Sequence, residues 1–168
     1  SNTDTINTGN DYIHVDGANT QLTGGFTNSS SGTINAGDDA IKLLANSTIS
    51  GSIINNGTIA AGGEAFDLNG NSDITGGVTN NGIITADDAF DIEGSDISGG
   101  VINTANGTIT VVDDFIDLDT NADISGGVIN NGIIISTDDD FLSIGNNSDV
   151  SGGVINNGTI TTAFGDGN

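Results

Sequence analysis

The chain has 168 residues, with one Lys or Arg against 23 Asp and Glu, and its formal net charge is -22. That balance excludes nucleic acid and anionic membrane surfaces as partners, because almost no cations are available to neutralise phosphate groups. Cys is absent, which excludes disulfide scaffolds, thiolate metal sites and cysteine nucleophiles. No apolar run is long enough to span a bilayer. No signal peptide is present either, so a secreted form is expected to be a mature chain or an excised piece.

The first predicted element is a short strand around Thr5 and Ile6, and its pattern returns along the whole chain. Successive copies of this isoleucine are separated by 28, 25, 25, 25, 25 and 26 residues. A period of this size indicates a repeat architecture. The aligned isoleucines are Ile6, Ile34, Ile59, Ile84, Ile109, Ile134 and Ile160.

Two further apolar segments follow in each repeat. One is an alternating pair, namely Ile13/Val15, Ile41/Leu43, Phe66/Leu68, Phe90/Ile92, Ile116/Leu118 and Leu142/Ile144. The other segment surrounds small turn residues, mostly a Gly pair. Its aliphatic residue before the turn is Leu22, Ile49, Ile74, Ile97, Ile124 or Val150. Its apolar residue after the turn is Phe26, Ile53, Val78, Val101, Val128 or Val154.

Short alternating segments bounded by Gly, Asn, Asp and Ser are typical of β-strands and turns. Helical repeats are excluded, because they need apolar spacings of three and four and do not tolerate 27 glycines. A unit of about 25 residues cannot bury its apolar face alone, so the units must stack. We predict one all-β domain over 1–168, a right-handed parallel β-helix (solenoid) of about six coils with three short strands per coil. The repeats start near 22, 49, 74, 97, 124 and 150.

An asparagine stands two residues after the apolar residue that follows the Gly turn, in every repeat. We expect the stacked amides to form a structural ladder from coil to coil, as they do in other stacked parallel sheets. The column consists of Asn28, Asn55, Asn80, Asn103, Asn130 and Asn156.

An acidic residue also recurs, two positions before the alternating pair. In a structural interpretation, the first acid of each Asp pair caps a turn amide and the others are solvated. In a functional interpretation, carboxylates of adjacent coils share Ca²⁺, which prefers several oxygen ligands. The spacing differs from the Gly-Gly-x-Gly-x-Asp pattern of calcium-binding nonapeptide repeats. The candidate calcium ladder is Asp11, Asp39, Glu64, Asp88, Asp114 and Asp140.

Other residues offer little for catalysis, and we expect no enzymatic activity. His14 is the only His, and with no second His and no Cys the sequence offers no convincing Ser/His triad or imidazole metal site. We expect this His to be a solvated surface residue. Carboxylate pairs of the kind glycosidases use are abundant, but one Tyr, no Trp and a single Lys provide little to hold a sugar.

Two patterns concern the outer surface. Thr108/Thr110 and Thr159/Thr161 form the Thr-x-Thr arrangement that resembles ice-binding solenoids, although the other repeats interrupt it. The second pattern is a set of isoleucines that alternate with inward positions and should therefore face outward. Together they would form an exposed apolar stripe, which usually marks a contact surface. An inverted pleat would instead place several of them in the core. The stripe residues are Ile54, Ile83, Ile102, Ile129, Ile133, Ile135 and Ile155.

The chain starts and finishes in the same column of the repeat. We therefore expect two mutually compatible edges and head-to-tail addition of copies, which yields filaments. The expected assembly interface consists of Thr5, Ile6, Thr159, Ile160 and Thr161. A fragment of a longer solenoid is the alternative.

The phrase Gly-Gly-Val-x-Asn-x-Gly-Thr-Ile, with segments such as DDAFDI at 87–92, resembles passenger repeats of Gram-negative autotransporter adhesins and related haemagglutinin-type surface proteins. The resemblance covers nearly the whole chain. It implies an extracellular or cell-surface location and a role in adhesion or matrix, and it carries over no site residue. We expect an extracellular structural subunit that forms fibres, with a spacer segment of a larger adhesin and a polysaccharide-active enzyme as alternatives. No host or matrix glycan can be named from the sequence.

Overall fold

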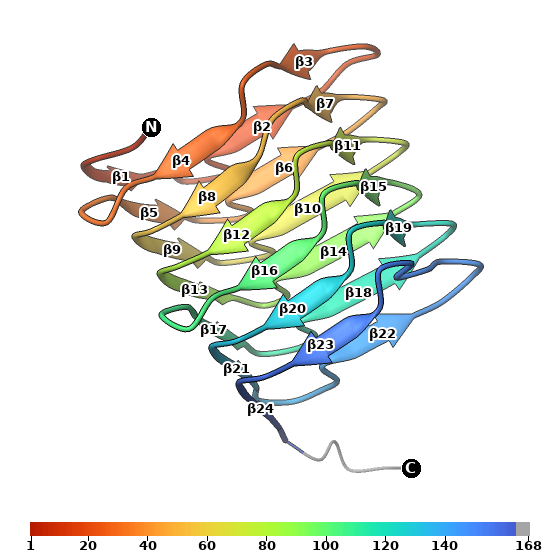
Figure 1. The fold of residues 1–168 in the computed structure, drawn as a ribbon. Helices are drawn as coiled ribbons and strands as arrows, with labels where there is room; N and C mark the ends of the chain where they lie inside the picture. Colours follow the sequence, from red (N-terminus) through yellow and green to blue (C-terminus); the bar gives the residue numbers. More distant parts are fainter. Residues whose placement is uncertain (164–168) are drawn as a thin grey trace.

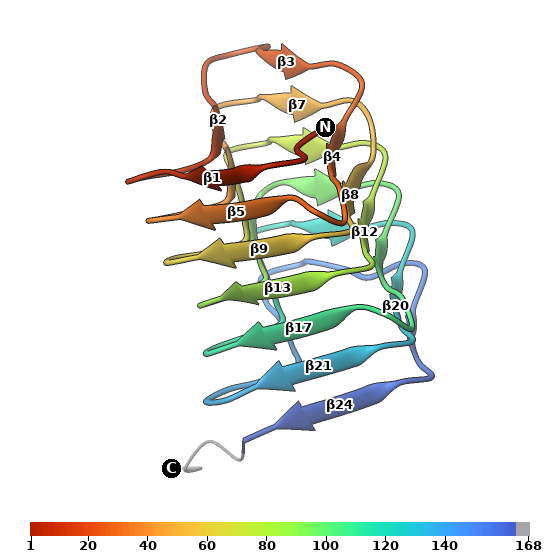
Figure 2. The same cartoon turned by 90° about the vertical axis from the view of Figure 1, so that its left-hand side faces the viewer.

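The computed structural model describes residues 1–163, which form an all-β parallel solenoid of about six turns (Figure 1). Each turn of the chain lays its strands beside the corresponding strands of the previous turn, so the sheets run along the length of the rod (Figure 2). No helix of the described residues meets the length and hydropathy needed to cross a membrane.

Four parallel sheets form the walls of the rod, numbered I to IV in chain order. Sheet I contains β1 (Thr5–Asn7), β5 (Thr33–Ala36), β9 (Thr58–Ala61), β13 (Ile83–Ala86), β17 (Thr108–Val111), β21 (Ile133–Ser136) and β24 (Thr159–Thr162). Sheet II contains β2 (Ile13–Val15), β6 (Ile41–Leu43), β10 (Phe66–Asn69), β14 (Phe90–Glu93), β18 (Ile116–Asp119) and β22 (Leu142–Ile144).

The other two walls have shorter strands. Sheet III contains β3 (Gln21–Leu22), β7 (Thr48–Ile49), β11 (Asp73–Ile74), β15 (Asp96–Ile97) and β19 (Asp123–Ile124). Sheet IV contains β4 (Phe26–Asn28), β8 (Ile53–Asn55), β12 (Val78–Asn80), β16 (Val101–Asn103), β20 (Val128–Asn130) and β23 (Val154–Asn156).

The prediction of an all-β parallel solenoid is confirmed, with three or four short strands per turn where three were expected. The additional strand arises because the chain bends between sheet III and sheet IV, at a glycine with positive φ in every coil except that of β7 and β8. Gly77, for example, has φ 77° between Ile74 and Val78, a conformation that residues with a Cβ rarely adopt. The bend splits one apolar segment of the sequence into two strands.

Strand register stacks each residue on its counterpart in the next coil. Ile84 of β13 pairs with Ile59 on one side and Ile109 on the other, and all three are buried. Aromatic side chains also stack, because Phe66 and Phe90 lie 4.7 Å apart with an interplanar angle of 8°. Inward columns of this kind place Ile, Val, Leu and Phe in one continuous core along the rod.

The structure shows whether the isoleucines of the predicted apolar stripe face outward or lie in the core. Ile54, Ile102 and Ile129 are half-buried between fully buried neighbours on each side. They therefore point outward from sheet IV, and the inverted pleat is wrong.

Two turns between sheets IV and I are longer than their counterparts, at 28–32 and 103–107. In the shorter turns, Gly82 lets the coils approach closely, since a Cβ there would lie 2.1 Å from the carbonyl oxygen of Gly57. The same corner thus combines tight glycine packing with tolerance of additional exposed residues.

Adjacent isoleucines give a test of this core. Ile84→Ala removes a fully buried side chain and is expected to lower the free energy of unfolding by about 3 kcal/mol, measured by urea denaturation. Ile83→Ala, on the neighbouring position that is 49% exposed, is the matched control and should change it by less than about 0.5 kcal/mol. Equal effects of the two substitutions would contradict the assigned pleat.

Candidate functional site

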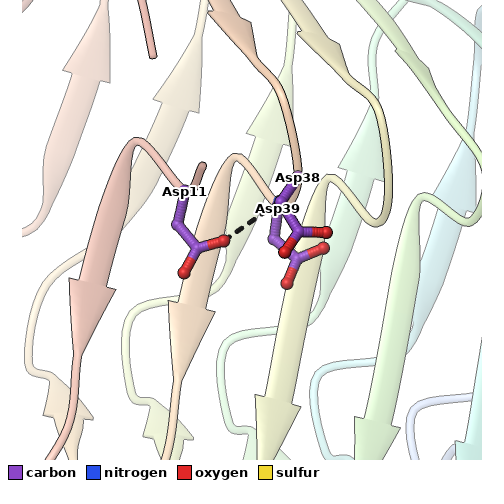
Figure 3. A group of neighbouring side chains, drawn as sticks. All are labelled: Asp11, Asp38 and Asp39. Carbon is purple, nitrogen blue, oxygen red and sulfur yellow. Dashed lines mark hydrogen bonds between the residues drawn. The ribbon is translucent and has the colours of Figure 1, made fainter. Parts of the chain in front are cut away.

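The six residues of the predicted calcium ladder line the corner between sheets I and II. Each lies two residues before the first core position of a sheet II strand, so the solenoid brings Asp11, Asp39, Glu64, Asp88, Asp114 and Asp140 into one column. Figure 3 shows the first part of this corner, where the carboxylates of Asp11, Asp38 and Asp39 gather on adjacent coils.

Most carboxylates of the column accept a hydrogen bond from the backbone of the next coil. The Asp11 carboxylate accepts from the Asp39 N–H at 3.2 Å, drawn as the dashed line in Figure 3. The Asp39 carboxylate accepts from the Glu64 N–H at 2.9 Å. Asp88 and Asp114 do the same for the N–H groups of Asp114 and Asp140, at 2.6 and 2.9 Å. In these Asp pairs the capping acid is the second one, so the expectation that the first acid caps the turn is wrong.

A second outward column lies beside the first, in the middle of the sheet II strands. Its register places His14, Lys42, Asp67, Asp91, Asp117 and Ser143 side by side. Lys42 donates from Nζ to Oδ2 of Asp39 at 2.5 Å and also bonds the Asp67 carboxylate. His14 is exposed, as expected, and its Nδ1 lies 2.6 Å from Oδ2 of Asp11.

Three groups of carboxylates in the described part of the chain bring their oxygen atoms within 4.8 Å of one another. They are Asp11/Asp38/Asp39, Asp39/Glu64/Asp67 and Asp113/Asp114/Asp139. Four residues of the predicted ladder belong to these groups, whereas Asp88 and Asp140 do not. Asp38, Asp67, Asp113 and Asp139 were not part of the prediction, although the Asp-Asp pairs and the outward strand position were visible in the sequence.

The middle group differs from the other two because the Lys42 ammonium already lies against two of its carboxylates. A protein cation therefore neutralises this group directly. Asp39 also belongs to the first group, so Lys42 contacts that group as well. Ca²⁺ prefers several carboxylate oxygens, and Asp113/Asp114/Asp139, which Lys42 does not contact, therefore offers the better donor set for a cation.

Burial and neighbouring groups shift the pKa values of several carboxyl groups at this corner and on the adjacent sheet II strands. A hydrogen bond with Asp39, together with burial, raises the pKa of Glu64 to about 8. Burial raises the pKa of Asp114 to about 7. Burial and the neighbouring Asp67 charge raise the pKa of Asp91 to about 6. Burial alone would raise the pKa of Asp39, but hydrogen bonds with Glu64 and Lys42 outweigh it and lower that pKa.

Stability should therefore fall as the solution becomes more alkaline. Carboxyl groups with raised pKa values hold protons more tightly in the folded chain than in the unfolded chain. Their contribution is fully present below about pH 4 and is lost as pH rises through their folded pKa values, between about 6 and 8. With allowance for solvent screening, we expect Tm at pH 5 to exceed Tm at pH 8 by roughly 5 °C.

Asp91→Asn tests the cause of this dependence. The substitution removes one crowded carboxylate and should raise Tm at pH 8 and flatten the pH profile measured by circular dichroism. Asp16→Asn, on an exposed turn, removes the same charge elsewhere and should leave the profile unchanged. A Tm that increases from pH 5 to pH 8 would contradict the argument.

The calcium hypothesis gives a separate prediction. Millimolar Ca²⁺ should raise Tm relative to chelator, because a bound cation stabilises the folded chain by mass action. Asp113→Asn combined with Asp139→Asn removes two carboxylates from the group that lacks Lys42 and should reduce the Ca²⁺-dependent increase. An identical melt in Ca²⁺ and in chelator would exclude the hypothesis.

The asparagine column forms a directional ladder along the corner between sheets IV and I. Asn28 Nδ2 donates to Oδ1 of Asn55 at 2.8 Å, and Asn55 repeats the bond to Asn80 at 2.9 Å. Every later step has the same direction, up to the donation from Asn130 to Asn156 at 2.9 Å. The expected structural role of the column is confirmed, and Asn2 adds a first step that sequence analysis missed, at 3.0 Å to Asn28.

The predicted assembly residues lie on the outermost strands of sheet I. Thr5 and Ile6 belong to β1, and Thr159, Ile160 and Thr161 belong to β24, at opposite ends of the rod (Figure 2). Ile6 pairs with Ile34, and Ile160 pairs with Ile134, so both ends keep the same column.

Comparison with protein-family models, with curated proteins and with solved structures found no match.

Proposed function

We propose that the protein is a structural rod, extended head to tail by further copies into a fibre at the cell surface or in an extracellular matrix. The observation that carries this proposal is the direction of the asparagine ladder. All of its amides donate toward the coil of β24, so the two ends of the rod differ chemically and are complementary to each other.

The two ends of the ladder match in detail. Asn156 Nδ2 has no acceptor among residues 1–163, whereas its Oδ1 accepts from Asn130 and from the Gly158 N–H. At the other end, Asn2 Oδ1 accepts the Asp4 N–H at 3.2 Å. Inner members such as Asn130 accept the corresponding turn amide and an amide of the preceding coil as well. A next copy would give Asn156 its acceptor and Asn2 its second donor.

The last coil also exposes side chains of core type. Val154 is 45% exposed and Ile144 is 48% exposed, although Val128 and Leu118 in the same columns of the preceding coil are buried. A second copy would place its Val15 over Ile144 in the same column, and it would pair the free edge of β24 with its own β1 in the parallel register that all inner strands use. Burial of this apolar surface favours addition.

Surface or matrix location rests on the resemblance to autotransporter passenger repeats together with the confirmed solenoid fold. A rigid spacer within a larger adhesin is the second candidate. It is supported by the same edges, because a further coil of the same polypeptide would cover Val154 as well as Ile144.

Asn156→Asp separates assembly from stability. Aspartate keeps the Oδ1 acceptor used by Asn130 and removes only the outward donor, so we expect an unchanged Tm and loss of fibres in electron microscopy and of large species in light scattering. Asn106→Asp, on an exposed turn, is the charge-matched control and should still form fibres. A wild-type chain that stays monomeric at high concentration would reject the fibre and favour the spacer.

A further inference from the structure

Charge is segregated to one half of the rod. From the second coil onward, every repeat contains an uninterrupted run without Asp, Glu, Lys or Arg, which covers sheet IV, the asparagine corner and sheet I. These uncharged runs are 43–63, 74–86, 97–112, 124–137 and 150–163. Apart from Asp4, which precedes β1 at the first coil, the acidic residues of the described chain lie in the remaining half, on sheets II and III and their turns. With a net charge of -22, random substitution would not leave two whole walls neutral.

Sheet I is the larger of the two neutral walls. Its strands from β5 onward contain four residues and present two outward columns, whereas those of sheet IV contain three and present one. Ile83 and Ile133 lie in one outward column of sheet I and are 49% and 44% exposed. This wall therefore combines exposed apolar side chains with an absence of charge from β5 onward, and another neutral surface could pack against it without burying a charged group.

The geometry points to a second copy of this chain as the occupant of sheet I, packed side by side with the rods parallel. A twofold contact joins each wall to its own copy, so a contact through sheet II would bring carboxylates together, whereas a contact through a neutral wall would not. Parallel rods related by a twofold axis along their length place the acidic corner of one copy over the asparagine corner of the other. Antiparallel rods would instead place the two acidic corners side by side.

This arrangement makes a self-complementary contact. The two outward columns of sheet I exchange partners across the twofold axis, so residues of one column meet residues two positions later in the other copy. Ile83 then faces Thr85 of the second copy, and Ile133 faces Ile135. Because both rods have the same coil spacing, every coil repeats the contact in register.

The size of the wall sets the strength of the contact. Seven strands spaced ~4.8 Å apart and about four residues wide give roughly 450 Å² per copy, which is about half of what a standard interface buries on each partner. A pair of single chains is therefore weak. Rods lengthened at their ends would pair more tightly, but side-by-side packing itself needs no end contact and stands independently of the fibre.

Disulfide trapping tests the pair, since the chain contains no Cys. Copies with Ile83→Cys are mixed with copies with Thr85→Cys, all in the Asn156→Asp background so that end contacts do not contribute. In 0.5 M NaCl with oxidised glutathione, we expect the mixed disulfide dimer at least about tenfold faster than for Asp91→Cys mixed with Glu93→Cys. This control has the same spacing on acidic sheet II.

A second mixture tests the direction of the rods. Thr58→Cys with Thr108→Cys would meet in an antiparallel pair, because β9 and β17 lie on either side of the central strand β13, and this mixture should cross-link as slowly as the sheet II control. Adding Ile133→Asp to both copies of the first mixture should slow its cross-linking. The proposal is overturned if the Ile83/Thr85 mixture is no faster than the sheet II control, or if the Thr58/Thr108 mixture is faster than the Ile83/Thr85 mixture.

Discussion

Parallel stacking of equivalent residues is the constraint on which the structure depends. Each coil must offer its neighbour the same strand positions in the same register, because the hydrogen bonds of every sheet run between coils and none closes within a coil. Inward positions satisfy this requirement easily, since Ile on Ile or Phe on Phe packs well. Asparagine satisfies it too, because an amide both donates and accepts. The side chains that stack poorly on themselves are the carboxylates.

The acidic corner shows how the fold accommodates that conflict. Carboxylates of one coil accept backbone N–H groups of the next, which uses the charge to satisfy turn amides. At the most crowded point, Lys42 lies between Asp39 and Asp67. Where Lys42 is out of reach, burial and then the neighbouring carboxylates raise the pKa values of Asp91 and Asp114, which favours their protonated forms. The stability of the folded chain therefore depends on pH.

The fold was accessible from sequence because stacking repeats one pattern six times. The isoleucine column and the alternating pairs predicted sheets I and II directly. Sheet III was not recognised as a separate wall, because its two-residue strands hold one inward residue each and show no alternation. The acidic column was found, but its capping acid was misassigned, since spacing does not tell which carboxylate points along the rod. Ladder direction was equally inaccessible, because it depends on amide orientation and not on residue identity.

At the corner between sheets IV and I, turns of different length are closed in the same way, so the rod accepts additional residues there. One asparagine amide closes the turn whether it is short, as from Asn55 to the Gly57 carbonyl at 3.2 Å, or long, as from Asn103 to the Gly107 carbonyl at 3.2 Å. Residues between these two anchor points, such as Ala105 and Asn106, are exposed. Foreign peptides inserted there would be displayed at intervals of one coil along a rigid support, which makes this edge a natural platform for regularly spaced epitopes.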